Sequence, residues 1–457
     1  MKIIILGAGT VGSTLAISLS KEDNDITVVD ENQATLHHLE EEADISTIVG
    51  SCSYPTTLVN AGIKEADMVV AVTGSDEINI VSSLMSKVLS PNVKTIARIR
   101  ESSYLQNKTK AAIDAGVIPV DIVVSPEKLI TNHIQALIDT PGSLQVLEFG
   151  DGLLYLVGVR AVSGGPLIGH EIADLKKHMP NVDTRVAAIF RSGGAIIPKG
   201  TTTVMAGDEV FFIARKKDAK RVINEMRTKE DPYKYVVIAG GGKIGSSLAE
   251  QIEDNHRVKI IESDPSRAKK ISESLLDTIV LEGNVSDKSL LHEENIEDCD
   301  VFVAVTNDDE ANVMSCMLAK EMGAHKVIAL INNEAYVDLV QGKSIDVAIA
   351  PSQITIGTFL SELAGDEVVK VHSLRRGVAE AIETIVRPSP NGNGDVVGKE
   401  LGTIKLPLGA TIGAIIRKNK AKIAHDNVKL RENDHVILFL TDKKLLPQIK
   451  DIFSPYQ

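Results

Sequence analysis

Short apolar runs of strand length alternate with helical patterns over residues 1–124. Lys2–Leu6 and Ile26–Val29 are almost continuously apolar, which is typical of strands buried on both faces of a parallel sheet. Between such runs, apolar residues recur at helical spacing, most clearly over Asp76–Val88. The further predicted strands are Ser46–Val49, Asp67–Val72, Thr95–Ile99 and Asp121–Val124. Strands with helices between them predict a doubly wound α/β sheet.

A helical pattern over Glu127–Asp139 follows the last of these strands and begins just after Pro126. Its apolar residues share one face of the helix, namely Leu129, Ile130, Ile134, Leu137 and Ile138. Two interpretations of this face stay open. Either the helix packs on the domain that precedes it, or it offers the apolar face to another copy of that domain.

The pattern changes after Thr140–Gly142, where short alternating strands punctuated by glycines replace the longer helices. Val157–Val159, Val186–Phe190 and Glu209–Ile213 are examples, and they predict a small β-rich α+β module. Glu230–Pro232 then has the composition of a linker.

The chain then starts again. Ala71–Asn79 recurs as Ala304–Asn312, and Asp121–Pro126 returns as Asp346–Pro351 ahead of another apolar helix. These matches indicate a tandem duplication with a period of roughly 225 to 233 residues. The predicted fold is α/β, with two Rossmann-like doubly wound parallel sheets, each followed by a small α+β module. The predicted domains are residues 1–124, 143–227, 233–349 and 369–453.

A glycine-rich turn joins the first predicted strand to the first helix. It comprises Gly7, Ala8, Gly9, Thr10, Val11 and Gly12, and the second strand ends at Asp30. In a dinucleotide-binding βαβ unit such glycines permit a tight turn, close approach of a pyrophosphate and close packing of the helix. A carboxylate at Asp30 accepts hydrogen bonds from ribose hydroxyls and repels a 2′-phosphate, so NAD is favoured over NADP. A Rossmann fold with an empty turn is the alternative.

The second repeat carries an equivalent turn with different chemistry. It comprises Gly240, Gly241, Gly242, Lys243, Ile244 and Gly245, and the next strand leads to Glu262. Lys243 stands where the first turn has Thr10, and Leu330 stands where the first sheet has Arg98. Because a guanidinium at Arg98 can reach a phosphate, we hypothesise that the two sites prefer different nucleotides.

Further candidate residues follow the strands at the edge where open α/β sheets bind ligands. Thr73 and Thr306 come after the fourth strand of each sheet and are placed to touch a nucleotide, although a threonine there can equally cap the next helix. Ser51, Cys52 and Asn284 follow the third strands, near the adenine end. Cys52 is expected to be a wall of the site and not a nucleophile.

Composition and charge argue against several function classes. A net charge of −13 and the absence of Trp argue against a nucleic-acid surface, so no nucleic acid is expected as a partner. Cys52, Cys299 and Cys316 lack CxxC spacing, which argues against disulfides or zinc and fits a reducing cytosol. No stretch approaches the roughly 18 apolar residues of a membrane span, so any role at a membrane must come through a partner.

Catalytic motifs are also missing from the sequence. There is no GxSxG elbow, no HExxH pair and no complete P-loop, since Val337 stands where Gly342–Ser344 would need an upstream glycine. The histidines form no spaced cluster, and His37 and His38 are expected on a solvated helix face. Neither a catalytic nor a metal site is therefore predicted. An NAD-dependent oxidoreductase is the alternative function, although the modules at 143–227 and 369–453 are small for substrate domains.

The two turns, each followed by a small β-rich module, resemble the RCK (also called KTN) family of regulatory proteins of potassium transport. The stretches that carry the resemblance are Lys2–Gly12, Gly165–Gly169, Asp183–Arg191, Ala304–Asn312, Leu374–Glu383 and Phe439–Lys444. The resemblance implies a regulator and not an enzyme. The family's nucleotide positions carry over to both turns, to Asp30, Thr73, Gly74 and Arg98, and to Glu262, Thr306 and Asn307.

The resemblance also implies ligands and partners. Proteins similar to this chain bind NAD(H), and also ATP or ADP, in their Rossmann-like domains. They form homo-oligomers, expected here as a tetrameric ring, on an integral-membrane potassium channel or transporter subunit. The chain is accordingly expected to be cytoplasmic and peripheral, on the cytoplasmic face of the bacterial inner membrane.

Overall fold

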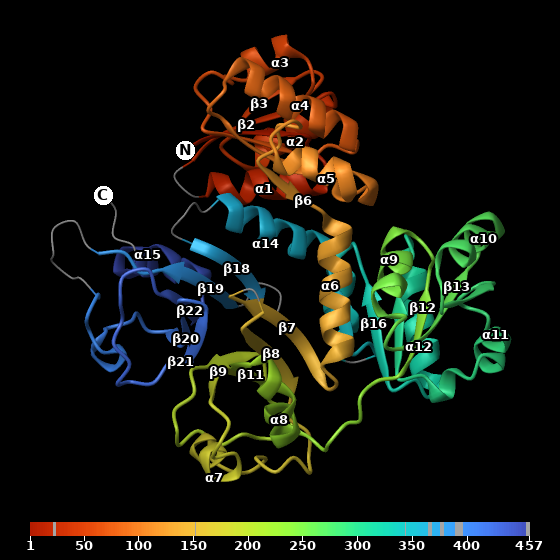
Figure 1. Cartoon of the computed structure of the whole chain (residues 1–457), viewed down its shortest axis with the longest axis vertical. Helices are drawn as coiled ribbons and strands as arrows, with labels where there is room; N and C mark the ends of the chain where they lie inside the picture. Colours follow the sequence, from red (N-terminus) through yellow and green to blue (C-terminus); the bar gives the residue numbers. More distant parts are fainter. Residues whose placement is uncertain are drawn as a thin grey trace. The chain divides into compact units, whose positions relative to one another are not determined.

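The first sheet of the computed structural model consists of parallel strands in the order β3-β2-β1-β4-β5-β6 (Figure 1). The structure describes residues 1–21, 24–150, 152–342, 344–363, 368–374, 379–388 and 396–453. The strands are β1 (Lys2–Leu6), β2 (Asp25–Asp30), β3 (Ser46–Val49), β4 (Met68–Ala71), β5 (Lys94–Arg98) and β6 (Ile122–Val124). The helices between them are α1 (Thr10–Ser20), α2 (Gln33–Glu42), α3 (Pro55–Asn60), α4 (Asp76–Leu89) and α5 (Asn107–Asp114). Ile3 to Leu6 of the central strand are all buried, as its apolar run predicts.

The second parallel sheet repeats this order as β14-β13-β12-β15-β16-β17. Its strands are β12 (Tyr235–Ala239), β13 (Arg257–Glu262), β14 (Ile279–Glu282), β15 (Val301–Ala304), β16 (Lys326–Leu330) and β17 (Val347–Ile349). Its helices are α9 (Lys243–Ile252), α10 (Pro265–Ser274), α11 (Lys288–Glu293), α12 (Asp309–Met322) and α13 (Glu334–Val340). The matching strand orders confirm the predicted pair of doubly wound sheets.

Two antiparallel sheets form the small modules. The first, in the order β10-β9-β11-β8-β7, comprises β7 (Ser143–Phe149), β8 (Leu154–Arg160), β9 (Thr184–Arg191), β10 (Gly194–Ile196) and β11 (Glu209–Arg215), with helices α7 (Leu175–His178) and α8 (Lys216–Met226). The second, in the order β18-β19-β22-β20-β21, comprises β18 (Val368–Leu374), β19 (Ala379–Ile385), β20 (Ala410–Arg417), β21 (Lys420–Ile423) and β22 (His435–Leu440), with helix α15 (Leu446–Phe453). The two sheets share one apolar core, in which the rings of Phe190 and Phe439 lie 6.4 Å apart. The predicted α+β modules are therefore confirmed.

The two helices that follow the parallel sheets are exchanged between the repeats. The chain divides into two compact units, Met1–Leu129 with Pro351–Glu362, and Ile130–Ala350 with Leu363–Gln457. Helix α14 (Pro351–Leu363) follows the second sheet but belongs to the unit of the first. Helix α6 (Pro126–Asp139) belongs, from Ile130 onward, to the unit of the second sheet. The apolar face of α6 is thus offered to the other copy of the domain, the second of the two interpretations.

A lysine at the start of the fifth strand of each sheet contacts the exchanged helix. Lys326 Nζ donates to the carbonyl oxygens of Leu137 at 3.2 Å and Ser143 at 2.9 Å. Burial lowers the pKa of Lys326 to about 8. In the other unit, Lys94 Nζ lies 3.5 Å from the carbonyl oxygen of Glu362. Leu137 and Glu362 occupy the same position relative to the proline that begins each helix, so both lysines meet helix C-terminal carbonyls, where a cation is favourable.

The predicted linker is held in place at Glu230. Arg227 forms an ion pair with this carboxylate, the Tyr233 hydroxyl donates to it at 3.0 Å, and His325 Nε2 lies 3.5 Å away. Burial by itself raises the pKa of Glu230, but the three partners together lower it to about 2. Because His325 directly precedes β16, the segment is anchored to the second sheet and is not a loose connection.

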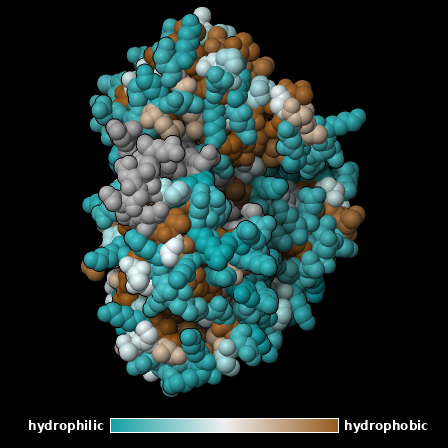
Figure 2. All heavy atoms as spheres, turned by 60° about the vertical axis from the view of Figure 1, so that its left-hand side comes forward, coloured by the Kyte–Doolittle hydropathy of each residue, from teal (hydrophilic) through white to brown (hydrophobic). Residues whose placement is uncertain are grey.

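The surface visible in Figure 2 is mainly hydrophilic, with apolar residues gathered in separate small groups. Helix α4 has an unusual distribution of side chains. Its buried face includes Asn79 and three serines, whereas its exposed apolar residues are Ile78, Val81, Leu84 and Val88. Helix α12 in the second repeat likewise exposes Met314 and Met317. Both helices therefore present apolar side chains to solvent.

Candidate functional site

The first glycine-rich turn requires glycine at two positions. Gly7 has a φ of +105°, and its N–H donates to the carbonyl oxygen of Val29 at 2.8 Å. A Cβ on Gly12 would lie 1.8 Å from the carbonyl oxygen of Gly7, so any larger residue would push α1 away from the turn. The predicted roles of these two glycines in the turn and in helix packing are thus explained by contact distances.

The opposite side of this turn is open. Gly9 is the N-cap of α1 and makes no side-chain cap, and a Cβ on Gly9 would meet no atom within 4 Å. Gly9 and Thr10 are exposed, while Val11 is partly buried. The first N–H groups of α1 therefore have no side chain that caps them, which is the arrangement that binds phosphate groups.

Asp30 lies directly beside the turn. Its Oδ2 accepts the N–H of Ala8 at 2.7 Å, and its Oδ1 accepts the N–H of Asn32 at 2.8 Å. The side chain is only partly buried, so further lone pairs of the carboxylate can accept hydrogen bonds. The structure thus brings the predicted acid and the predicted phosphate cradle together.

The second turn has the same backbone. Gly240 has a φ of +103° and donates to the carbonyl oxygen of Ile261 at 2.9 Å, and a Cβ on Gly245 would lie 2.0 Å from the carbonyl oxygen of Gly240. Gly242 caps α9 without a side chain and faces open space. Lys243, which is exposed, and Ile244, which is partly buried, begin the helix.

Glu262 differs from Asp30 in its surroundings. It accepts the N–H of Gly241 at 2.9 Å and that of Asp264 at 2.8 Å, and Arg267 Nη1 lies 3.2 Å from its Oε2. Burial by itself raises the pKa of Glu262, but the two N–H donors and Arg267 lower it below its usual value. Arg267 was missed by sequence reasoning.

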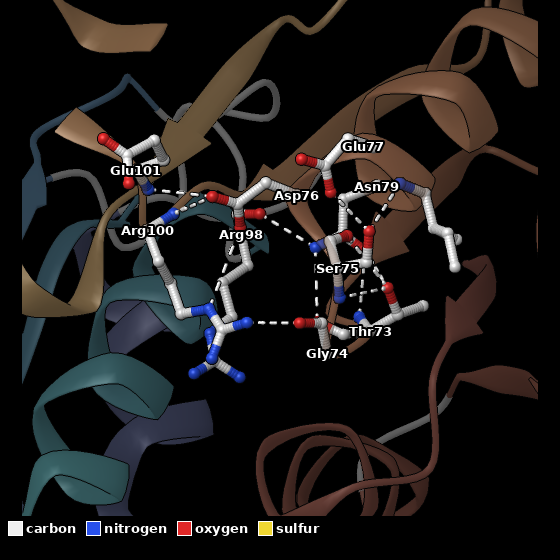
Figure 3. A network of polar contacts seen from close by, with 10 residues as sticks. Thr73, Gly74, Ser75, Asp76, Glu77, Asn79, Arg98, Arg100 and Glu101 are labelled. Atoms are coloured by element: carbon white, nitrogen blue, oxygen red, sulfur yellow. Dashed lines mark hydrogen bonds and ion pairs between the residues drawn. The ribbon is translucent and has the colours of Figure 1, made fainter. Parts of the chain in front are cut away.

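Thr73 and Thr306 make equivalent hydrogen bonds in the two repeats. The Thr73 hydroxyl lies 2.7 Å from Asn79 Oδ1, which also accepts the Thr73 N–H at 2.9 Å (Figure 3). The N-cap of α4 is Ser75, whose hydroxyl accepts the N–H of Ile78, so Thr73 is not the cap. Thr306 makes the equivalent bonds to Asn312, at 2.7 and 2.9 Å.

The buried asparagines join neighbouring strands at this edge. Asn79 Nδ2 donates to the carbonyl oxygen of Arg98 at 2.8 Å, and Asn312 Nδ2 donates to that of Leu330 at 2.9 Å. Both side chains are fully buried. Sequence reasoning did not single them out as site residues, although both recur in the matching segments of the repeat.

Two arginines meet at the end of β5. Figure 3 shows the guanidinium groups of Arg98 and Arg100 close to each other, with Arg100 donating to the carbonyl oxygen of Gly74. Burial lowers the pKa of Arg98 and the positive charge of Arg100 lowers it further, while the carboxylates of Glu127 and Asp76 partly oppose this shift. Arg98 Nε is buried and makes no hydrogen bond within the described part of the chain. Two adjacent guanidinium groups, of which that of Arg100 also lies 3.8 Å from Asp76 Oδ1, can bind an anion.

The second sheet lacks this pair of cations. Leu330 and Asn332 occupy the positions of Arg98 and Arg100. Asp309, the counterpart of Asp76, accepts N–H groups from Asn332 at 2.9 Å and Asn333 at 2.8 Å. Arg100, like Arg267, was not predicted.

The remaining predicted residues follow the third strand of each sheet or lie in the loop after β15. Ser51 is partly buried, and Cys52 is buried with its Sγ 3.4 Å from the carbonyl oxygen of Val29. Burial raises the pKa of Cys52 to about 12, so its thiol is protonated at neutral pH, as expected for a wall of the site. Asn284 and Asn307 are exposed.

Other sequence features have simple structural outcomes. His37 and His38 are 73% and 72% exposed, as predicted for a solvated helix face. No helix among the described residues has the length and apolar character needed to cross a bilayer. Within the same residues, no cluster of His, Cys, Asp or Glu is arranged to hold a metal ion. Lys343 and residues 375–378, which fall in two of the quoted motifs, lie outside the described residues.

Comparison with known proteins agrees with this architecture. A family model described as the TrkA-N domain matches residues 3–126 and 236–351, and one described as the TrkA-C domain matches residues 156–227. The chain is similar to the crystal structure of the GsuK RCK domain (TM-score 0.61, 18% identity, covering 100% of this chain and 95% of that one). It is equally similar to a GsuK channel bound to NAD (TM-score 0.61, 18% identity, 100% and 79% covered). A GsuK structure bound to ADP matches at a TM-score of 0.50 and 15% identity, covering 79% and 69%.

The fold thus defines a protein with two tandem RCK-type domains. Sequence relatives specify the family more closely. The Trk system potassium uptake protein TrkA of Halomonas elongata is 51% identical over 99% of both chains, and that of Vibrio alginolyticus is 49% identical over 100% of this chain and 99% of its own. The chain belongs to the TrkA family.

Proposed function

We propose that this chain is the cytoplasmic regulatory subunit of a potassium uptake system and that nucleotides bound at its two glycine-rich turns set its state. The observation that carries the proposal is the pair of turns, each with an uncapped helix N-terminus and a nearby carboxylate. The relatives named as Trk system potassium uptake proteins match the chain from end to end, which supports the potassium-transport role.

The proposed ligands are NAD(H) and also ATP or ADP. The NAD-bound and ADP-bound GsuK structures, whose fold this chain shares, support this choice. The residues proposed for the first site are Gly7, Ala8, Gly9, Thr10, Val11, Gly12, Asp30, Ser51, Cys52, Thr73, Gly74 and Arg98. Those proposed for the second site are Gly240, Gly241, Gly242, Lys243, Ile244, Gly245, Glu262, Asn284, Thr306 and Asn307.

The proposed partner is an integral-membrane potassium channel or transporter subunit on the cytoplasmic face of the bacterial inner membrane. The names of the relatives support a link to potassium uptake, and the GsuK channel, whose fold this chain shares, supports a channel as the partner. Residues 1–124, 143–227, 233–349 and 369–453 are the proposed domains. The proposed role is that of a regulator and not an enzyme, in line with relatives that are named as potassium uptake proteins.

A homo-oligomer, proposed as a tetrameric ring, is supported by the exposed apolar residues of α4. Ile78, Val81 and Leu84 are 37%, 42% and 39% exposed, and Val88 is 64% exposed, while Asn79 and three serines are buried. Apolar side chains that follow one helix face are typical of a surface covered in an assembly.

Regulation by such a subunit is a shift of population between conformations. A nucleotide can favour one arrangement only by as much as it binds that arrangement more tightly, typically about 1–3 kcal/mol per site. Several equivalent sites in one ring add their contributions.

The decisive experiment measures potassium flux through the membrane partner in liposomes, with and without this chain, while each nucleotide is titrated. Nucleotide-dependent flux only in the presence of the chain is the expected result. Flux that ignores every nucleotide would refute the proposal. Oxidation of NADH with turnover, followed by its absorbance, would favour the oxidoreductase instead.

A further inference from the structure

The carboxylates of the two sites differ in how completely they are bonded. Asp30 accepts one backbone N–H on each oxygen and stays partly exposed. Glu262 also accepts one backbone N–H on each oxygen, but its side chain is only 4% exposed. Asp30 therefore keeps room for a hydroxyl donor, whereas Glu262 is covered.

Arg267 is the cation that pairs with Glu262. Its Nη1 lies 3.2 Å from Glu262 Oε2, and its Nη2 lies 3.9 Å from Asp264 Oδ2. Asp264 and Asn32 are the N-caps of the equivalent helices α10 and α2, so the position of Arg267 is occupied by Thr35 in the first repeat. The first site has no guanidinium at this place.

A second side chain of α10 also crowds the turn. A Cβ at Gly241 would lie 2.4 Å from Ile271 Cδ1 and 3.2 Å from Glu262 Oε2. The first repeat has Ala8 at this position, whose real Cβ is accommodated. The Ile271 side chain thus occupies the space that a side chain at position 241 would need, next to the carboxylate.

We infer that Arg267 determines whether the second site discriminates between nucleotides that carry ribose and nucleotides that carry 2′-deoxyribose. Its guanidinium takes the place of a ribose hydroxyl on Glu262, so the second site does not distinguish ribose from 2′-deoxyribose, whereas the first site does. This inference rests on the proposed function and refines it, because both turns still bind the phosphates.

The physical basis is competition for one acceptor. A ribose hydroxyl gains a charge-assisted hydrogen bond only where the carboxylate has a lone pair open to the ligand. Such a bond corresponds to about tenfold or more in affinity. At Glu262 the hydroxyl must displace Arg267, and a half-exposed ion pair is worth about as much as the gain, so loss of the hydroxyl changes affinity by less than about twofold.

The test isolates each site in the full chain. Gly9 and Gly242 have ordinary φ values of −68° and −65°, and a Cβ on either meets no atom within 4 Å. A side chain at either position therefore starts into open space, and the carboxylate of a glutamate there is expected to repel phosphate. The Gly242→Glu chain reports the first site, and the Gly9→Glu chain reports the second.

Calorimetry then compares ADP with 2′-deoxy-ADP. The first site is expected to bind the deoxy compound about tenfold more weakly, and the second site less than about twofold more weakly. Arg267→Met in the Gly9→Glu chain is expected to raise the discrimination to about tenfold. Lys270→Met, at an exposed lysine on the same helix, is the charge-matched control and is expected to leave the ratio unchanged.

Equal discrimination by both sites, or an unchanged ratio in the Arg267→Met chain, overturns the inference while leaving the proposed function intact. Absence of ADP binding by both single-site chains overturns the proposed function, and this inference with it.

Discussion

The two glycine-rich turns have the same backbone and different surroundings. Gly7 and Gly240 both have a positive φ. A Cβ on Gly12 would lie 1.8 Å from the carbonyl oxygen of Gly7, and a Cβ on Gly245 would lie 2.0 Å from that of Gly240. Around this shared backbone, the first site has two arginines and a partly exposed carboxylate, whereas the second has a leucine, an asparagine and a covered carboxylate. Steric contacts therefore restrict the glycines in both repeats alike, while the side chains around the turns differ between the repeats.

The largest expected effect tests the backbone conformation that the two glycine-rich turns share. Gly12→Ala and Gly245→Ala place a Cβ 1.8 and 2.0 Å from a backbone carbonyl oxygen, which forces the helix away from the turn. Each is expected to lower the free energy of unfolding by about 3 kcal/mol or more in denaturant titrations. Gly9→Ala, which meets nothing, is the control and is expected to stay within about 0.5 kcal/mol. Unequal losses at the two turns would contradict the shared backbone.

A difference in pH dependence is expected from Glu230, whose partner His325 directly precedes a strand of the second sheet. The position of its partner His325 is taken by the apolar Val93 in the first repeat. The folded pKa of Glu230, about 2, lies below its ordinary value of 4.5, so its contribution to stability is present above pH 4.5 and is lost as the pH falls towards 2.

Glu230→Gln is accordingly expected to lower the free energy of unfolding by about 2–3 kcal/mol at pH 7, and by progressively less below pH 4.5. Denaturant titrations at pH 7 and below pH 4.5 measure this difference in the free energy of unfolding, with Glu250→Gln on the exposed side of α9 as the control. A loss that is the same at every pH would show that the carboxylate charge is not what stabilises this joint.

The buried asparagines are expected to matter equally in both repeats. Asn79→Ala and Asn312→Ala leave the N–H after the fourth strand and a carbonyl oxygen of the fifth strand without their partner. Each is expected to lower the free energy of unfolding by about 2 kcal/mol, measured by thermal or chemical unfolding. Asn60→Ala, at an exposed asparagine, provides the control. A clear loss in one repeat only would break the equivalence of the two edges.

The smallest effect concerns the arginine pair. Arg98→Leu gives the first site the residue of the second and is expected to weaken ATP binding there about tenfold, measured by calorimetry in the Gly242→Glu chain. Stability is expected to stay the same or rise, because burial and Arg100 both disfavour the charge on Arg98. Unchanged affinity would mean that Arg98 does not contact the phosphates, and Leu330→Arg provides the converse test.

Local patterns made the strands and the turns predictable. The expected strand Lys2–Leu6 is β1 without adjustment, and Asp67–Val72 is observed as Met68–Ala71, because a fully buried parallel strand needs a continuous apolar run. The glycines of the turns and Asp30 could likewise be found from spacing alone. Asn79 and Asn312 gave a usable signal, since both recur at one offset from a threonine, but nothing local showed that they are buried.

Contacts between distant segments could not be predicted. Lys326 contacts Leu137, 189 positions earlier in the chain, and no local pattern pairs a strand lysine with a helix carbonyl. Arg267 lies on a polar helix and has no arginine counterpart in the first repeat, so the duplication gave no signal for it. Its role becomes visible only when α10 is placed against the turn.

The helix exchange has a consequence for any attempt to divide the protein. A chain cut between the repeats, near residue 230, would not yield two half-size copies. The N-terminal fragment would keep α6 without the sheet that buries Ile134 and Leu137, and would lack α14. The two fragments could restore the packing only by associating and exchanging these helices, which depends on their concentration. In the intact chain the covalent link keeps each exchanged helix close to the sheet it packs on. The sequences of the two repeats can therefore differ while the exchanged helices stay in place.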